Sequence, residues 1–255
     1  MTVVGPLVEN PIADWISRKV YDRLSGRALA CAVNARNHLV RAQKVADISE
    51  TISFFCATHA TEEAVACFVA AAKASRYADL AKKINIRDHA QKIVLASYVQ
   101  VIADQFDGAG LSVAHDPRND RLLARVKKEE GDKIYPLGLH LFSFNENRED
   151  PSHMAAHQAF MSRFPNPAEM VGSVLERASD RDNALYAKDD GAPALSRERL
   201  DIGLKEHTLL TLGLTWAAID VTYHDEPEPF VVQVLGAVAE VINEVRPSKV
   251  RAKND

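Results

Sequence analysis

Apolar residues recur at helical spacing along most of the chain, and polar capping residues mark several of the starts. Ser49 is placed to cap one helix, and Asp88 followed three residues later by Gln91 has the form of a capping box. Residues 209–219 are apolar on every face, which is typical of a helix at the centre of a bundle. A turn is predicted at Asp189–Pro193. The pattern predicts helices over residues 28–46, 49–82, 88–106, 152–163, 167–178, 196–222 and 229–245.

Between Leu111 and Phe144 the helical spacing gives way to alternation broken by turn residues. The segments LSVAH, RLLARV and KIYPLGLHLFSF are separated by DPRN and EEGD, which is typical of a three-stranded antiparallel meander with solvated tips. Pro136 places the last strand at an edge or a break. The predicted fold is therefore mainly α, a single helical domain over residues 1–255, with a small antiparallel β-meander insert at residues 111–144.

The composition narrows the classes of function. With 47% hydrophobic and 26% charged residues the chain should fold compactly, and a net charge of -4 argues against coating nucleic acid through bulk positive charge. Three cysteines do not make a disulfide framework, which favours a reducing compartment. The longest uncharged stretch, residues 207–219, is shorter than the roughly 17 to 25 residues needed to span a bilayer. We expect a cytoplasmic protein with no membrane partner.

The predicted helix over residues 49–82 places two polar side chains on its apolar stripe. Both His59 and Glu63 fall near the centre of this stripe. A buried carboxylate needs a partner, which His59 offers from the same face and Arg36 from the preceding helix. These residues fit either a functional site or an ion pair that sets the register of two helices.

The segment IRDHAQKI, residues 86–93, gathers cationic side chains at a predicted helix start. With Asp88 as N-cap, Arg87 lies outside the helix and can fold back, while His89 and Lys92 share one face. Backbone N–H groups and the helix dipole favour a phosphate there, and an imidazole can move a proton near neutral pH. The alternative is a solvated helix start with ordinary surface charges.

Three segments together resemble one family. The sequences ACAVNARNHLVRAQKVAD, SFFCATHATEEAVACF and IRDHAQKI contain an Asn-Ala pair, a Glu-Glu pair and an Arg-x-His-x-x-Lys motif. This order resembles the AbiV family of abortive-infection proteins, a branch of the HEPN superfamily of helical RNA-acting proteins. The resemblance covers about residues 28–106 and extends more faintly over 177–200, where RDNALYAKDDGAPALS is similar to a later family segment. It implies a HEPN-like helical bundle.

The same resemblance implies a function and roles for four residues. The chain would be a phage-defence protein that acts on RNA or on translation, either as a metal-independent endoribonuclease or without catalysis. His89 would act as acid or base, Arg87 and Lys92 would hold phosphate, and Glu63 would orient the cluster. HEPN-like proteins often place their sites at a two-fold interface, so the resemblance also implies a homodimer, with a phage or host protein as a further candidate partner that activates it.

Two other histidine patterns offer alternative sites. HEPN ribonucleases typically have an Arg followed by four to six residues and a His, and Arg148 with His153 is the one pair that fits. His153 and His157 also stand four apart, a spacing that can hold one metal ion between two imidazoles. No third ligand is evident, and we expect neither a metal nor a cofactor.

A different class of function fits the sequence as well. The chain would then be a non-catalytic helical adaptor or sensor that binds a phage or host protein through the meander or the apolar helices. Removal of residues 116–130 would in that case abolish partner binding, whereas substitutions of Arg87 and His89 would have no effect.

Overall fold

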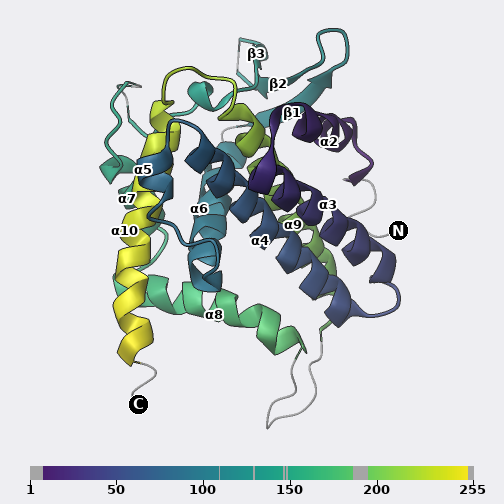
Figure 1. Ribbon diagram of the computed structural model, residues 1–255, viewed down its shortest axis with the longest axis vertical. Coiled ribbons are helices and arrows are strands. Elements are labelled where there is room, and N and C mark those ends of the chain that lie inside the picture. The colour runs from purple at the N-terminus through teal and green to yellow at the C-terminus, as the bar shows by residue number, and fades with distance from the viewer. Residues whose placement is uncertain are drawn as a thin grey trace.

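The computed structural model describes residues 8–108, 110–128, 130–145, 147, 149–185 and 195–251. Helices dominate this part of the chain, and a small sheet lies at one end of them (Figure 1). The predicted turn at Asp189–Pro193 lies outside the described residues. The helices are α2 (Pro11–Arg23), α3 (Gly26–Val45), α4 (Glu50–Ala74), α5 (Ala78–Ala81), α6 (His89–Gly108), α7 (Met154–Met161), α8 (Pro167–Leu185), α9 (Arg197–Asp220) and α10 (Pro229–Arg251).

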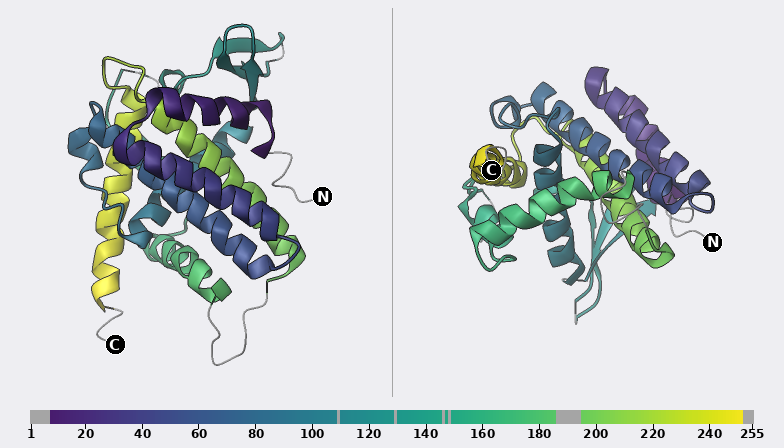
Figure 2. Two further views of the ribbon diagram at one scale, coloured as in Figure 1. Left: turned by 45° about the vertical axis from the view of Figure 1, so that its right-hand side comes forward. Right: turned by 90° about the horizontal axis from the view of Figure 1, so that it is seen from below.

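Helix α4 is the centre of the fold. It packs between α3 and α9, and small residues such as Ala57, Ala60 and Ala64 are fully buried along it, which lets the neighbouring helices approach closely. Helices α6 and α10 stand beside this layered core, while α8 crosses the ends of both α6 and α9 (Figures 1 and 2). The mainly helical class predicted from the sequence is confirmed.

The single helix predicted over residues 49–82 is wrong beyond Ala74. Ser75 has an extended backbone, which ends the hydrogen-bond ladder of α4, and the chain resumes as the short helix α5. Tyr77 at this break is buried, and its hydroxyl accepts a hydrogen bond of 2.8 Å from the Glu228 backbone N–H. The break therefore turns the chain from the centre of the fold towards α10.

Helix α2 was missed by apolar spacing, although a local signal for it exists. Asn10 caps the helix by accepting a hydrogen bond of 2.9 Å from the Ile12 backbone N–H, and Pro11 occupies the first helical position. Trp15 and Ile16 are buried against the core. An Asn-Pro pair before the first apolar residues is the signal that predicts this start.

The predicted meander is present as an antiparallel sheet with the strand order β1-β2-β3. Leu122 and Ala124 on the central strand are buried, whereas the described part of the last strand is exposed throughout. That strand ends at Pro136, although the Leu137 N–H still donates to the Leu122 carbonyl at 2.9 Å, and it is much shorter than the predicted segment. The strands are β1 (Leu111–Asp116), β2 (Arg121–Val126) and β3 (Lys133–Pro136).

The tip between β1 and β2 is attached to α2 rather than fully solvated. Asp120 has a positive φ of 46° and accepts from Lys19 Nζ at 2.7 Å and from both terminal nitrogens of the Arg18 guanidinium at 3.3 Å. Trp15 Nε1 donates to the Asp120 carbonyl at 2.8 Å.

Across the described residues, none of the helices is both long and apolar enough to cross a membrane.

Candidate functional site

A buried carboxylate from α4 meets two basic side chains at the start of α6. Glu62 Oε2 lies 2.7 Å from His89 Nδ1 and 2.7 Å from Lys92 Nζ. The side chains of Glu62 and Lys92 are 5% and 8% exposed, whereas that of His89 is 49% exposed. The cluster therefore has a buried ion pair on one side and a solvent-facing imidazole on the other.

Asp88 positions the two basic residues by capping α6. Its Oδ1 accepts a hydrogen bond of 2.9 Å from the Ala90 backbone N–H, and its Oδ2 accepts one of 3.3 Å from Gln91 Nε2. Gln91 Oε1 accepts from the Asn85 backbone N–H at 2.8 Å, so Gln91 holds both the cap residue and the incoming loop. With the helix start held in this way, His89 and Lys92 are three residues apart and face α4 together.

The electrostatics of the cluster keep Glu62 ionised. Burial by itself would raise the pKa of this carboxyl group, but the hydrogen bond and positive charge of Lys92, with smaller contributions from His89 and His59, lower its pKa below the ordinary value. The carboxylate is therefore charged at neutral pH, and Lys92 is its buried counter-ion.

The carboxylate in the cluster is that of Glu62, not that of Glu63 as expected from the helical stripe. Glu63 points to the other side of α4, where it interacts with Cys31 of α3. Burial, with the nearby Glu63 charge, raises the pKa of the Cys31 thiol. Because α4 is buried on almost every face, its sequence has no single inner stripe that distinguishes two adjacent glutamates.

The other residues expected in the site make contacts different from those predicted. Arg87 is exposed just before α6, and its backbone N–H donates to Asn85 Oδ1 at 3.0 Å. Lys92, expected to hold phosphate, contacts Glu62 instead. Arg36 does not pair with Glu63, because its Nε donates to Ser17 Oγ of α2 at 3.2 Å.

His59 lies beside the cluster and contacts α3. Its ring packs against Phe55, with centroids 4.2 Å apart, and meets His38 of α3 edge to face at 5.4 Å. Its charge is one of the causes that lower the Glu62 pKa. His59 thus lies between the cluster and α3.

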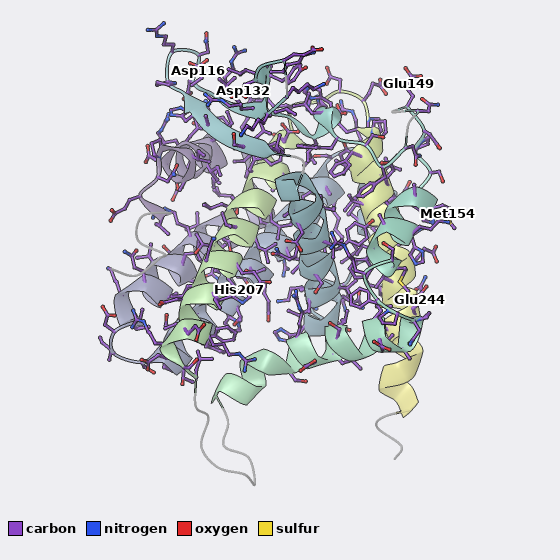
Figure 3. All side chains as sticks on the ribbon, turned by 180° about the vertical axis from the view of Figure 1, so that it is seen from behind. Asp116, Asp132, Glu149, Met154, His207 and Glu244 are labelled. Carbon is purple, nitrogen blue, oxygen red and sulfur yellow. The ribbon has the colours of Figure 1, made fainter. Side chains whose placement is uncertain are left out.

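The secondary histidine candidates lie at the packing interface of α7 and α10. His153 Nε2 is 3.8 Å from Glu240 Oε1, and His157 Nε2 is 3.3 Å from Glu244 Oε1. Figure 3 shows Glu244 on the far side of α6 from His207. Arg148 lies outside the described residues. In the described part of the chain, no three His, Cys, Asp or Glu side chains come together as metal ligands would.

A cleft of about 230 Å³ opens on the other side of Glu62, between α4, α6, α8 and α9. Thr61 Oγ1 on its wall is 3.0 Å from His207 Nδ1 of α9. Burial, together with the Arg177 charge, lowers the pKa of His207 to about 4, so this imidazole is neutral at neutral pH. Arg177 of α8 and Arg199 of α9 complete the basic part of the lining.

Sequence reasoning missed this cleft. Thr61 and His207 are 146 positions apart, so no local spacing reports their contact. The available signal was a His at the edge of the apolar segment of α9, where an imidazole is out of place unless a polar partner reaches it.

No protein-family model matches this chain, and no curated protein or solved structure is similar to it.

What the cluster can do follows from its geometry. In a neutral His89 imidazole, Nδ1–H donates to Glu62, which leaves the ring lone pair on Nε2. This is the arrangement in which a carboxylate orients a histidine to accept a proton from a substrate.

Proposed function

We propose that this chain is an AbiV-like phage-defence protein of the HEPN type that acts on RNA or on the translation machinery, as a homodimer. The observation that carries the proposal is the contact of Glu62 with His89 and Lys92. These three side chains come from two of the segments on which the family resemblance rests, the Glu-Glu pair and the Arg-x-His-x-x-Lys motif. Glu62 and His89 are 27 positions apart in the sequence, and the fold joins them in one cluster.

As a metal-independent endoribonuclease, the chain would use His89 as the general base. The imidazole Nε2 would take the proton of an RNA 2′-hydroxyl, the 2′-oxygen would attack the adjacent phosphorus, and the bond to the 5′-oxygen would break. That leaving oxygen takes up a proton from a water molecule, which gives a 2′,3′-cyclic phosphate and a 5′-hydroxyl, and the His89 imidazolium returns its proton to the solvent. Glu62 would stabilise the imidazolium, and the exposed Arg87 would hold the phosphate.

The test is cleavage of a labelled RNA by purified protein in the presence of EDTA. We expect cyclic-phosphate ends from the wild-type protein and a loss of at least 100-fold in rate for His89→Gln, the size of a typical general-base contribution. His157→Gln is the control, because His157 lies between α7 and α10, where its Nε2 is 3.3 Å from Glu244 Oε1. Equal cleavage by the His89 variant and the control would remove His89 from the mechanism.

One observation favours the alternative of a protein-binding adaptor. Strand β3 is an exposed edge, and it presents the apolar side chains of Ile134 and Tyr135, which are 54% and 40% exposed. An exposed edge strand can pair with a strand from another protein. If Ile134→Lys abolishes defence in cells while His89→Gln leaves defence intact, the adaptor function replaces the nuclease function.

A further inference from the structure

One histidine lies between two carboxylates where α9 ends and α10 begins. His224 Nε2 is 3.5 Å from Asp220 Oδ2, at the end of α9, and His224 Nδ1 is 3.2 Å from Glu228 Oε1, directly before α10. The two nitrogens of one ring therefore face different carboxylates. The connection between the two helices lies at the same end of the molecule as the sheet (Figure 1). We name these three side chains the α9–α10 latch.

Both carboxylates of the latch are largely shielded from water. The side chains of Asp220 and Glu228 are 8% and 15% exposed, and that of His224 is 27% exposed. Within the part of the chain that the structure describes, no lysine or arginine forms an ion pair with either carboxylate. The Tyr77 hydroxyl contacts Glu228 through its backbone N–H, not through its carboxylate. A charge on His224 is therefore the nearest compensation for two buried carboxylates.

The other charged and titratable groups around His224 do not replace it. Arg76, between α4 and α5, donates from Nη1 to the His224 carbonyl at 2.7 Å and from Nη2 to Asp225 Oδ1 at 3.0 Å. The exposed His140 meets the His224 ring edge to face, with centroids 5.7 Å apart. Burial raises the pKa of Asp220, against the opposing charges of His224 and, to a smaller extent, His140. This carboxyl group thus depends on the nearby imidazole to stay ionised.

The charge on the imidazole decides whether both carboxylates are balanced. A neutral imidazole has one N–H and one lone pair, so it can donate towards one carboxylate while its lone pair faces the other. An imidazolium has an N–H on both nitrogens and places a positive charge between the two carboxylates. Loss of its proton leaves two buried negative charges without a counter-ion, which is a costly arrangement.

Asp220 also fastens the segment that follows β3. Its Oδ2 accepts a hydrogen bond of 2.8 Å from the Leu139 backbone N–H, at the start of the 3₁₀ turn η1 (Leu139–Leu141). The side chains of Leu139 and Phe142 line an apolar pocket between α6, α9 and α10. Movement of Asp220 away from this position would break the hydrogen bond and free the backbone of that pocket wall.

We propose that the α9–α10 latch is a pH-dependent switch, in which protonated His224 holds Asp220 and Glu228 in place and its deprotonation releases the segment at Leu139. The latch is closed on the acidic side of the His224 titration and opens on the alkaline side, because the positive charge between the carboxylates is lost as the pH rises. This regulation is independent of the proposed RNA-directed chemistry, because no latch residue belongs to the Glu62 cluster.

Amide hydrogen exchange of the full chain, measured by NMR from a pH of about 5 to about 9, tests the switch, since this range spans the usual imidazole pKa. The protection factor of the Leu139 amide, which is its intrinsic exchange rate divided by the observed rate, should fall by roughly tenfold or more as His224 loses its proton. That size is a lower limit for the loss of a buried ion pair. Imidazole ¹H–¹⁵N spectra of the same samples report the charge on His224, so the two changes should share one midpoint.

The amides of α4 are the internal reference, and their protection should not change at this midpoint. A protection factor of Leu139 that stays constant while His224 loses its proton would overturn the proposal. A fall of the same size in α4 would also overturn it, because the change would then belong to the whole fold.

Two substitutions separate the charge from the hydrogen bond. Asp220→Asn keeps an oxygen that can accept from the Leu139 N–H but removes one negative charge, so protection of Leu139 should stay high and become nearly independent of pH. His224→Gln removes the titrating group, so protection should be independent of pH and as low as in the wild-type protein at alkaline pH. His157→Gln, at the interface of α7 with α10, is the control and should keep the wild-type pH dependence. The full wild-type pH dependence in either latch variant would show that His224 is not its source.

Discussion

The ion pair between Glu62 and Lys92 can be tested quantitatively, because both charges are buried. At 2.7 Å their attraction is about 6 kcal/mol for an effective dielectric constant of about 20, before the loss of hydration is subtracted. Removing one partner leaves the other charge buried, so Glu62→Gln and Lys92→Met should each lower the free energy of unfolding by about 3 to 5 kcal/mol.

Replacing both charges together should be far less harmful than these single changes suggest. The double variant Glu62→Gln, Lys92→Met leaves no buried charge at this position, and we expect it to be at least 2 kcal/mol more stable than the less stable single variant. Urea denaturation followed by circular dichroism gives the free energies, and Glu63→Gln is the control, with an expected loss of about 1 kcal/mol or less. Additive losses in the double variant would refute the assignment of a buried, coupled pair.

Four further outcomes follow from the structure. The pKa of Glu62 is lowered on folding, so this carboxylate contributes fully to stability above the ordinary carboxyl pKa and less as the pH falls below that value. Acid denaturation of Glu62→Gln should lack this pH-dependent loss. The pKa of His207 is lowered to about 4, so this imidazole stays neutral in the fold, whereas the unfolded chain takes up its proton near pH 6.5. The free energy of unfolding should therefore decrease as the pH is lowered from about 6.5 to about 4. Urea titrations at each pH should show a smaller decrease for His207→Gln. Gly203→Ala should destabilise by about 1 to 3 kcal/mol, because the added Cβ would lie 2.7 Å from the Phe54 ring, whereas Gly213→Ala should stabilise by up to about 1 kcal/mol, and thermal melts would compare them. Asp120→Ala should speed hydrogen exchange in β1 and β2 without changing exchange in α4, since Asp120 joins the sheet to α2 through Lys19 and Arg18, and unchanged exchange in the strands would refute that role.

Local chemistry explains what could be predicted from the sequence. The cap at Asp88 and the three strands with their turns depend on residues a few positions apart, and both predictions are confirmed. The choice between Glu62 and Glu63 could not be made in the same way. Adjacent residues on a helix differ by about 100°, and a helix buried on nearly all sides gives no outer face from which to set the phase.

The cleft beside Glu62 depends on contacts that no local pattern contains. Arg177 and Arg199 flank the segment 186–194, which lies outside the described residues, and they face Glu62 from more than a hundred positions away in the sequence. Only the packing of α8 and α9 against α4 brings them to one cleft. For the same reason the neutral state of His207 could not be anticipated, because it depends on burial and on the charge of Arg177.

The central claim is that Glu62 orients His89 for proton transfer, and its most direct test is the tautomeric state of this imidazole. Long-range ¹H–¹⁵N correlation spectra recorded at a pH of about 8, above the usual imidazole pKa, distinguish a proton on Nδ1 from one on Nε2. We predict the Nδ1–H tautomer for His89 in the wild-type protein and its loss in Glu62→Gln, with the other imidazole signals unchanged. An Nε2–H tautomer in the wild-type protein, or spectra of His89 that are the same in both proteins, would contradict the account.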